Sequence, residues 1–482
     1  MPELPDPEIL RGYLAGIIGR THALERIAEA ALEDGFHSDE PRELLVAIGR
    51  LAAATRPRAI QIWNEFVSSR ATRHLVQLRG LDQSIRELAA HVRLPARATS
   101  DRVPGVLTRL LAEKVRQFSK DGHVILRPAW RYGYKVRRFD FVAEIRALFQ
   151  EVLSTSAEVD HCFAGTNLGR LFILSFPLLE LRSIHLHSVV AHELGHLLAA
   201  DLKPPLEETQ RFFEQLREKS PQRSAQQSLP FKRDEMASAD AARTCAFREF
   251  AADIAGVLLL GIPALLGAVE VAASRGLDGR GQSIKTDYPT WGRRLLVQLK
   301  VADDEGWLRL PTVQEEDDTG FAGATAAVSR HLTAVREWIE SDSKRWPVPD
   351  PWLSMGHDEA ERLVPWIVTS LKDLAPPCLA KPTLVYQRLP RLFSRLMKGV
   401  PPDSLEDAAP WTTTAPSLED ILAASWWSRI GSSQLEFVKD GIAEDSSEGL
   451  ERIRRLTLKA IENVDFVSRF RDRVAETKGA GA

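Results

Sequence analysis

Residues 1–100 alternate apolar and polar positions with the period of an α-helix. Segments such as PEILRGYLAGIIG and PRELLVAIGRLAAAT place apolar residues three and four positions apart, and Pro, Gly or Asp/Ser residues separate them. We find no fixed repeat period among these segments. The pattern predicts a helical bundle or an irregular solenoid in this region.

The pattern changes after the polar stretch 94–105. HVILRPAW and YGYKVRRFDF are enriched in β-branched and aromatic residues on either side of residues 131–133, which predicts a β-hairpin. LGRLFILSF is a later extended run that stops at Pro177. We expect LFILSF to be an edge strand, to which an extended peptide could add as another strand.

A long helix is predicted over residues 181–202, and helical patterns return beyond residue 300, with proline-rich breaks near Pro376, Pro401 and Pro410. The sequence therefore predicts an α+β fold that is predominantly helical. A mixed region at 101–300 lies between a helical N-terminal region at 1–100 and a helical C-terminal region at 301–482.

Residues 254–269, IAGVLLLGIPALLGAV, carry no charge and approach the length of a membrane span. Asp253 and Glu270 flank them, Pro263 and three glycines interrupt them, and the run is shorter than the roughly 18 residues that a span needs. A buried helix followed by a turn is favoured over a membrane span.

The charge composition argues against a nucleic-acid-binding protein. Lysine and arginine total 63 against 66 acidic residues, and a net charge of -3 provides no long-range field for nucleic acid. The run WRYGYKVRR at 130–138 interleaves aromatic and basic groups, but alternation on a half-exposed hairpin explains it without a nucleic acid partner.

The three cysteines, Cys162, Cys245 and Cys378, show no CxxC spacing, so a disulfide framework and a thiolate zinc site are not expected. The N-terminus lacks the basic and apolar regions of a secretory signal. We expect a cytoplasmic protein.

The segment SVVAHELGHLLAADL carries the strongest chemical signal. His192 and His196 lie four residues apart, so on a helix both imidazoles leave the same face and can meet one ion. Glu193 lies beside them as a general base that does not ligate, and Gly195 removes bulk. This HExxH arrangement suits zinc-assisted hydrolysis.

A catalytic zinc needs a third protein ligand, and no HExxHxxGxxH extension follows, because Leu202 occupies the position of a third histidine. The segment REFAADIAGVLLLG offers Glu249 and Asp253 on one helix face. Glu249 is the predicted third ligand of one Zn²⁺ ion. Asp253 is predicted to accept a hydrogen bond from the far nitrogen of a zinc-binding histidine.

With Glu249-Phe-Ala-Ala-Asp253 after the HExxH, residues 172–299 resemble the gluzincin peptidases, and the core is similar to that of the CAAX prenyl protease and HtpX-type peptidases without their membrane spans. The resemblance implies a zincin-like metallopeptidase core at 101–300. It also implies catalytic roles for Tyr288, which replaces the histidine of a His-Pro-x-x-x-x-Arg segment, and for Arg294.

We therefore expect a zinc endopeptidase that acts on a protein or peptide, with helical flanks that could bind a protein partner. Two alternatives stay open: a zinc-stabilised interaction module with a closed site, and a hydrolase of non-peptide amides or esters. A fourth protein ligand, with His185 or Cys245 as candidates, would favour the interaction module. A packed or hydrogen-bonded role is favoured for both residues.

Overall fold

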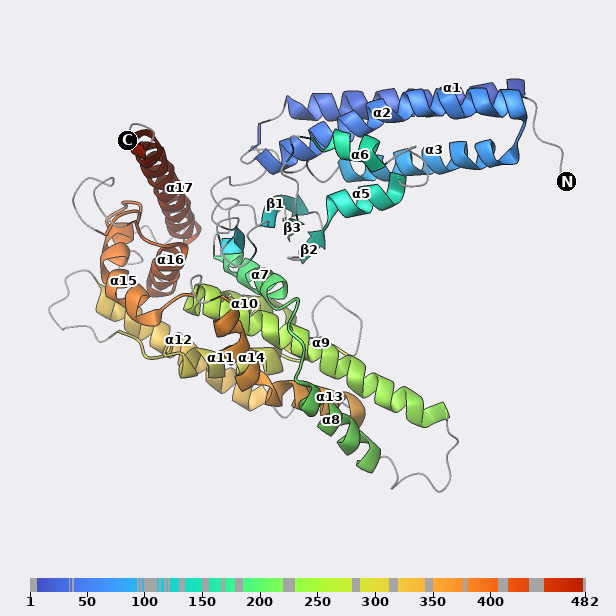
Figure 1. Cartoon of the computed structure of the whole chain (residues 1–482). Coiled ribbons are helices and arrows are strands. Elements are labelled where there is room, and N and C mark those ends of the chain that lie inside the picture. Colours follow the sequence, from blue (N-terminus) through green and yellow to red (C-terminus); the bar gives the residue numbers. More distant parts are fainter. Residues whose placement is uncertain are drawn as a thin grey trace. The chain divides into compact units, whose positions relative to one another are not determined.

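The computed structural model forms two compact units, residues 1–181 and 182–482 (Figure 1). The residues that the structure describes are these: 7–92 apart from 34, 37 and 38; 95, 98, 111, 114–116 and 119; 122–129; 135–149; 156–177 apart from 165 and 167–169; 185–219; 230–279; 287–311; 320–342; 350–375; 379–405; 415–432; and 446–479. The predicted α+β, predominantly helical fold is confirmed, whereas the predicted region boundaries stay predictions.

The first unit combines long amphipathic helices with a small sheet. Its elements in chain order are α1 (Pro7–Leu32), α2 (Asp39–Ser69), α3 (Thr72–Val92), β1 (Gly122–Ala129), β2 (Lys135–Phe139), α5 (Phe141–Phe149), α6 (Ser156–Cys162) and β3 (Arg170–Pro177). Apolar residues of the helices and of β1 and β3, among them Ile48, Ile125 and Ile173, form one buried core. Helices are therefore present as predicted for residues 1–100, but some of the expected breaks are not: Gly19 lies inside α1 and Pro57 inside α2.

The sheet has the order β1-β3-β2, with β3 parallel to β1 and antiparallel to β2. Two predictions are therefore wrong. β1 and β2 do not form a hairpin, because β3 lies between them, and β3 is the central strand, so its backbone is already paired on both sides. Its run from Leu171 to Leu174 is buried, as expected for a strand covered on both faces, whereas Lys135, Arg137 and Arg138 of β2 are exposed.

Within its described residues, the second unit is built from helices. In chain order they are the 3₁₀ turn η3 (Leu186–Val189), α7 (Val190–Leu198), α8 (Leu206–Lys219), α9 (Pro230–Leu260), α10 (Ile262–Arg275), α11 (Trp291–Asp304), α12 (Phe321–Asp342), α13 (Pro351–Arg362), α14 (Val364–Leu374), α15 (Pro382–Met397), α16 (Leu418–Ser432) and α17 (Ser446–Gly479). Helix α9 packs against α7, α10, α11, α13 and α14, so it is the central element of this unit.

The apolar segment 254–269 spans the end of α9 and the start of α10. The chain breaks at Gly261, which has a φ of 68°, and a side chain there would overlap the ring of Trp307. All of these residues are buried except Ala268, which is half-buried. In the part of the chain that the structure describes, every helix is too short or too polar to be a membrane span.

Helix α7 is shorter than the predicted helix at 181–202. It begins at Val190 after the 3₁₀ turn, in which the Ser188 hydroxyl donates a hydrogen bond to the carbonyl of His185. Residues 181–184 lie outside the described residues. At the other end the chain turns at Ala199 before the Pro204-Pro205 pair.

Helices α7 and α9 approach each other backbone to backbone. A Cβ built on Gly195 would lie 2.8 Å from the Cα of Ala252, and one on Gly256 would lie 3.3 Å from the amide nitrogen of His192. The small residues at these positions therefore set the spacing of the two helices, which carry the predicted metal ligands.

Gly195→Ala is expected to lower the free energy of unfolding by about 1–3 kcal/mol, because the new methyl group forces α7 away from the backbone of α9. Gly323→Ala is the control: this helical glycine has open space around its Cβ position, and the change should raise stability by about 0.4–1 kcal/mol. Urea unfolding measures both. Equal effects of the two substitutions would contradict the proposed close packing.

Candidate metal centre

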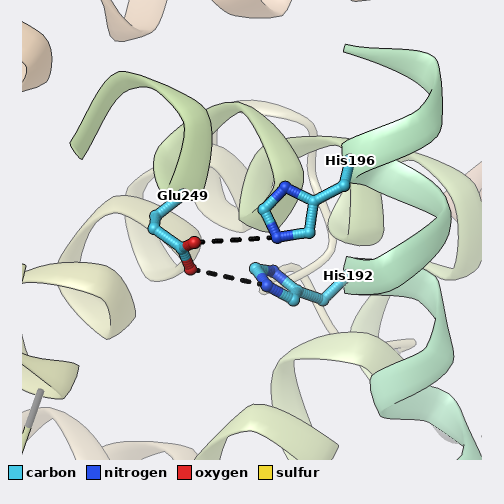
Figure 2. Close-up of side chains that lie close together, drawn as sticks. All are labelled: His192, His196 and Glu249. Atoms are coloured by element: carbon cyan, nitrogen blue, oxygen red, sulfur yellow. Dashed lines mark ion pairs between the residues drawn. The ribbon is translucent and has the colours of Figure 1, made fainter. Parts of the chain in front are cut away.

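Three predicted ligands converge between α7 and α9. Figure 2 shows the imidazoles of His192 and His196, one turn apart on α7, directed at the carboxylate of Glu249 on α9. The Nε2 atom of His192 lies 3.6 Å from Oε2 of Glu249, and the Nε2 atom of His196 lies 3.7 Å from Oε1. The three residues form a group whose ligand atoms all lie within 4.8 Å of one another.

These distances fit a shared ion. Separations of 3.6 and 3.7 Å are too long for hydrogen bonds. Two ligand atoms, each roughly 2.1 Å from a tetrahedrally coordinated zinc, would be about 3.4 Å apart. Two imidazole nitrogens and one carboxylate also make up the donor set of known catalytic zinc sites. The three side chains could therefore hold one divalent metal ion.

Asp253 orients the first histidine. Its Oδ1 lies 2.8 Å from Nδ1 of His192, and its side chain is 2 % exposed. Because a carboxylate only accepts, we assign the proton of His192 to Nδ1, which leaves the lone pair of Nε2 facing Glu249. This is the contact that the sequence predicted for Asp253.

Arg294 connects Glu249 and Asp253 of α9. Its guanidinium donates to both carboxylate oxygens of Asp253, at 2.8 and 2.7 Å, and lies 3.1 Å from Oε2 of Glu249. It also stacks over the ring of Trp291, 4.2 Å from the ring centre. Thr290 caps the start of α11 and so helps to fix Arg294 in the first turns of this helix.

His196 and Asp253 have the protonation states that suit a metal cation. Burial, followed by the charges of His192 and Arg294, lowers the pKa of His196 to about 3, so this imidazole is neutral near pH 7. Burial raises the pKa of Asp253, but Arg294 and His192 outweigh it and hold that pKa well below its usual value. Burial and Arg294 lower the pKa of His192, and Asp253 and Glu249 outweigh them and raise it.

The two remaining predicted residues also belong to this region. Glu193 is 9 % exposed on α7, next to His192, and its charge acts on Arg294. Tyr288 is half-buried just before α11. Burial and the charge of Glu249 raise the pKa of Tyr288, so its hydroxyl stays a hydrogen-bond donor at neutral pH. All of the predicted site residues therefore come from α7, α9 and the α11 segment.

His185 and Cys245 are not part of the three-residue group. His185 is 1 % exposed, and its Nε2 lies 2.8 Å from the hydroxyl of Ser425 on α16, so it is a packed and hydrogen-bonded residue, as favoured. Burial and the charge of Glu249 raise the pKa of Cys245 to about 12, so its thiol keeps its proton. Neither serves as a fourth ligand in this arrangement.

A cavity of about 420 Å³ extends from His196 along the junction of α7 and α9. Three cationic side chains line it, namely Lys203, Arg243 and Arg248. No sequence pattern predicted these cations. The sequence carries only a weak signal for this cationic lining. Arg248 directly precedes the predicted ligand Glu249, but no spacing rule relates Arg248 to Lys203.

Arg294→Met is expected to destabilise the metal-free protein by about 3 kcal/mol or more, because it leaves the Asp253 and Glu249 carboxylates buried without their counter-charge. Arg293→Met is the matched neighbour, whose partner Asp358 has a 61 % exposed side chain, and should cost less than about 1 kcal/mol. Chemical unfolding in a chelator compares the two. Equal costs would show that the buried cluster contributes no more than a surface ion pair.

Comparisons with protein-family models, curated proteins and solved structures found no match to this chain.

Proposed function

We propose that the chain is a zinc-dependent peptidase of the gluzincin type. The observation that supports this best is the group formed by His192, His196 and Glu249, with Asp253 behind the first histidine. A His₂Glu donor set with one open coordination position is typical of zinc hydrolases, and imidazole and carboxylate together suit zinc better than calcium or magnesium.

Charge balance supports a divalent ion. Arg294 forms a bidentate pair with Asp253, so the positive charge of Arg294 compensates this carboxylate first. Glu249 faces both imidazoles, and Glu193 is nearly buried beside His192, so two further negative charges lie in this region. A dication there completes the balance that buried charges require.

A bound zinc ion supplies Lewis acidity, which lowers the pKa of water and polarises a substrate carbonyl. In the proposed mechanism Glu193 holds the attacking water, accepts its proton and passes this proton to the leaving amine. Tyr288 keeps its hydroxyl proton and donates a hydrogen bond to the oxygen that becomes negative. Arg294 holds Glu249 and Asp253 in place and so positions the ligands.

A peptide bond is the proposed target because of the resemblance of the HExxH and Glu249–Asp253 segments to gluzincins. The hydrolysis of another amide or an ester would use the same groups. The third possibility, a closed zinc-binding interaction module, receives no support from His185 or Cys245, because neither belongs to the ligand group. A cytoplasmic location and a protein partner bound through the helical flanks complete the proposal.

Purified protein is expected to contain one zinc ion per chain, measured by elemental mass spectrometry after dialysis. His192→Ala, His196→Ala and Glu249→Ala should each reduce the zinc content below about a tenth of that of the wild type, because the loss of one of three ligands removes a large part of the binding free energy. His331→Ala and Glu337→Ala, on α12, should retain the metal. Full zinc content in the three ligand variants would contradict the site.

Glu193→Gln should keep the zinc and the fold but abolish peptide cleavage, since an amide cannot accept the proton of water. The loss should be at least about a hundredfold in kcat. Newly formed protein N-termini, compared between cells that produce the wild type and cells that produce this variant, measure cleavage and identify substrates together. Glu207→Gln, at an exposed position of α8, is the control and should cleave like the wild type. Cleavage by Glu193→Gln at the wild-type rate would refute the proposed base.

A further inference from the structure

The cavity beside the metal centre carries an excess of positive charge. Its described lining residues are His196, Ala199, Ala200, Leu202, Lys203, Pro204, Arg243, Thr244, Phe247 and Arg248. None of these is acidic. Three of them are cations, although the chain as a whole has a net charge of -3. This local charge therefore does not follow from the overall composition.

Two of the three cations have no acidic partner within the part of the chain that the structure describes. Lys203 follows the end of α7 and is exposed, and Arg248 is exposed on α9, next to the ligand Glu249. The charge of Arg248 lowers the pKa of His196 and also acts on Tyr288, so it reaches the predicted reaction centre. Both cations are free to bind an anionic group from outside.

The third cation, Arg243, gives the cavity a fixed wall. Its side chain is 8 % exposed, is paired with Asp240 at 3.1 Å and donates to the hydroxyl of Thr209 at 3.2 Å. Its guanidinium also packs over the rings of Phe212 and Phe213. Asp240 compensates part of its charge, so Lys203 and Arg248 provide most of the attraction for an anion.

The remaining lining is apolar. Leu202, Pro204 and Phe247 contribute hydrocarbon surface, and Phe247 is held by packing against Trp366, with ring centres 6.2 Å apart. A volume of about 420 Å³ admits a single amino-acid side chain with water and lies in the range of ligand pockets. Apolar walls that include cationic side chains fit a short aliphatic chain that ends in a carboxylate.

We propose that this cavity is a specificity subsite that binds a carboxylate of the peptide substrate, next to the bond that is cleaved. The inference rests on the proposed peptidase function, since His196 belongs to both the metal group and the cavity wall. The carboxylate comes either from an Asp or Glu side chain close to the cleaved bond or from the C-terminus of the substrate. Lys203 and Arg248 bind it, and Arg243 shapes the wall.

The cleavage test uses a proteome-derived peptide library and the zinc-loaded protein, with the cut sites read by mass spectrometry. Wild type and the control Lys381→Gln, an exposed cation at the start of α15, should both show a carboxylate within two residues of the cut: either Asp or Glu is enriched about tenfold at one position, or the cuts gather at the free C-terminus of the peptides. The double variant Lys203→Gln/Arg248→Gln should lose this enrichment. Arg248→Glu should replace it with a preference for Lys or Arg. Zinc content is measured for every variant.

A second arm distinguishes the two sources of the carboxylate. The same library with amidated C-termini is cleaved at internal acidic positions when the side chain is bound, and it resists cleavage when the free C-terminus is bound. Cleavage without any carboxylate preference, or a preference that survives in the double variant, would overturn the subsite and leave the peptidase function intact.

A binding experiment tests the subsite independently of the peptidase function, for the case in which the wild type cleaves no peptide. Zinc-loaded Glu193→Gln is titrated into fluorophore-labelled hexapeptide pools with a central Glu or a central Gln, and anisotropy is recorded. Tighter binding of the Glu pool, by about tenfold, that is lost with Lys203→Gln/Arg248→Gln supports the subsite even if the wild type cleaves no peptide. Equal binding of both pools that also stays unchanged when their C-termini are amidated would contradict it.

Discussion

Helices α7 and α9 pack with backbone against backbone where Gly195 faces Ala252, and the geometry of the metal centre depends on this contact. One face of α9 carries acidic and small residues alternately, at Glu249, Ala252, Asp253 and Gly256. The small residues let α7 approach, and the acids then lie within reach of its imidazoles. A larger side chain at either small position would separate ligands that must lie within a few ångströms of one ion.

The close packing of α7 and α9 buries the carboxylates of Glu193, Glu249 and Asp253 in a region of low dielectric constant. This burial is unfavourable unless cations compensate the negative charges. Arg294 supplies one cation from α11, a third helix, and binds Asp253 and Glu249 at the same time. The stacking of Arg294 over Trp291 and the cap at Thr290 hold it there. Fold stability and metal binding are therefore connected through the same buried charges.

The sequence predicted the grouping of His192, His196 and Glu249 and the contact of Asp253 with His192. Helical spacing places each pair of residues on one helix face, and a catalytic zinc needs a third protein ligand. It did not predict the strand order, because β3 inserts between β1 and β2 although it follows both in the chain. Periodicity identifies strands and not their partners. The 3₁₀ turn before α7 was also missed. Its hydrogen bonds are local, from the amide and the hydroxyl of Ser188 to the carbonyl of His185, but apolar periodicity does not distinguish such a turn from the first turn of a helix.

The cationic cavity could not be found from sequence for a related reason. Lys203 and Arg248 are separated in the chain and meet only because α7 ends beside α9.

The metal centre can be tested by X-ray absorption at the zinc edge of the purified protein. We expect a single zinc environment with only nitrogen and oxygen neighbours at about 2.0–2.2 Å, including two imidazoles. A sulfur neighbour at about 2.3 Å, or the absence of bound zinc after loading, would contradict it.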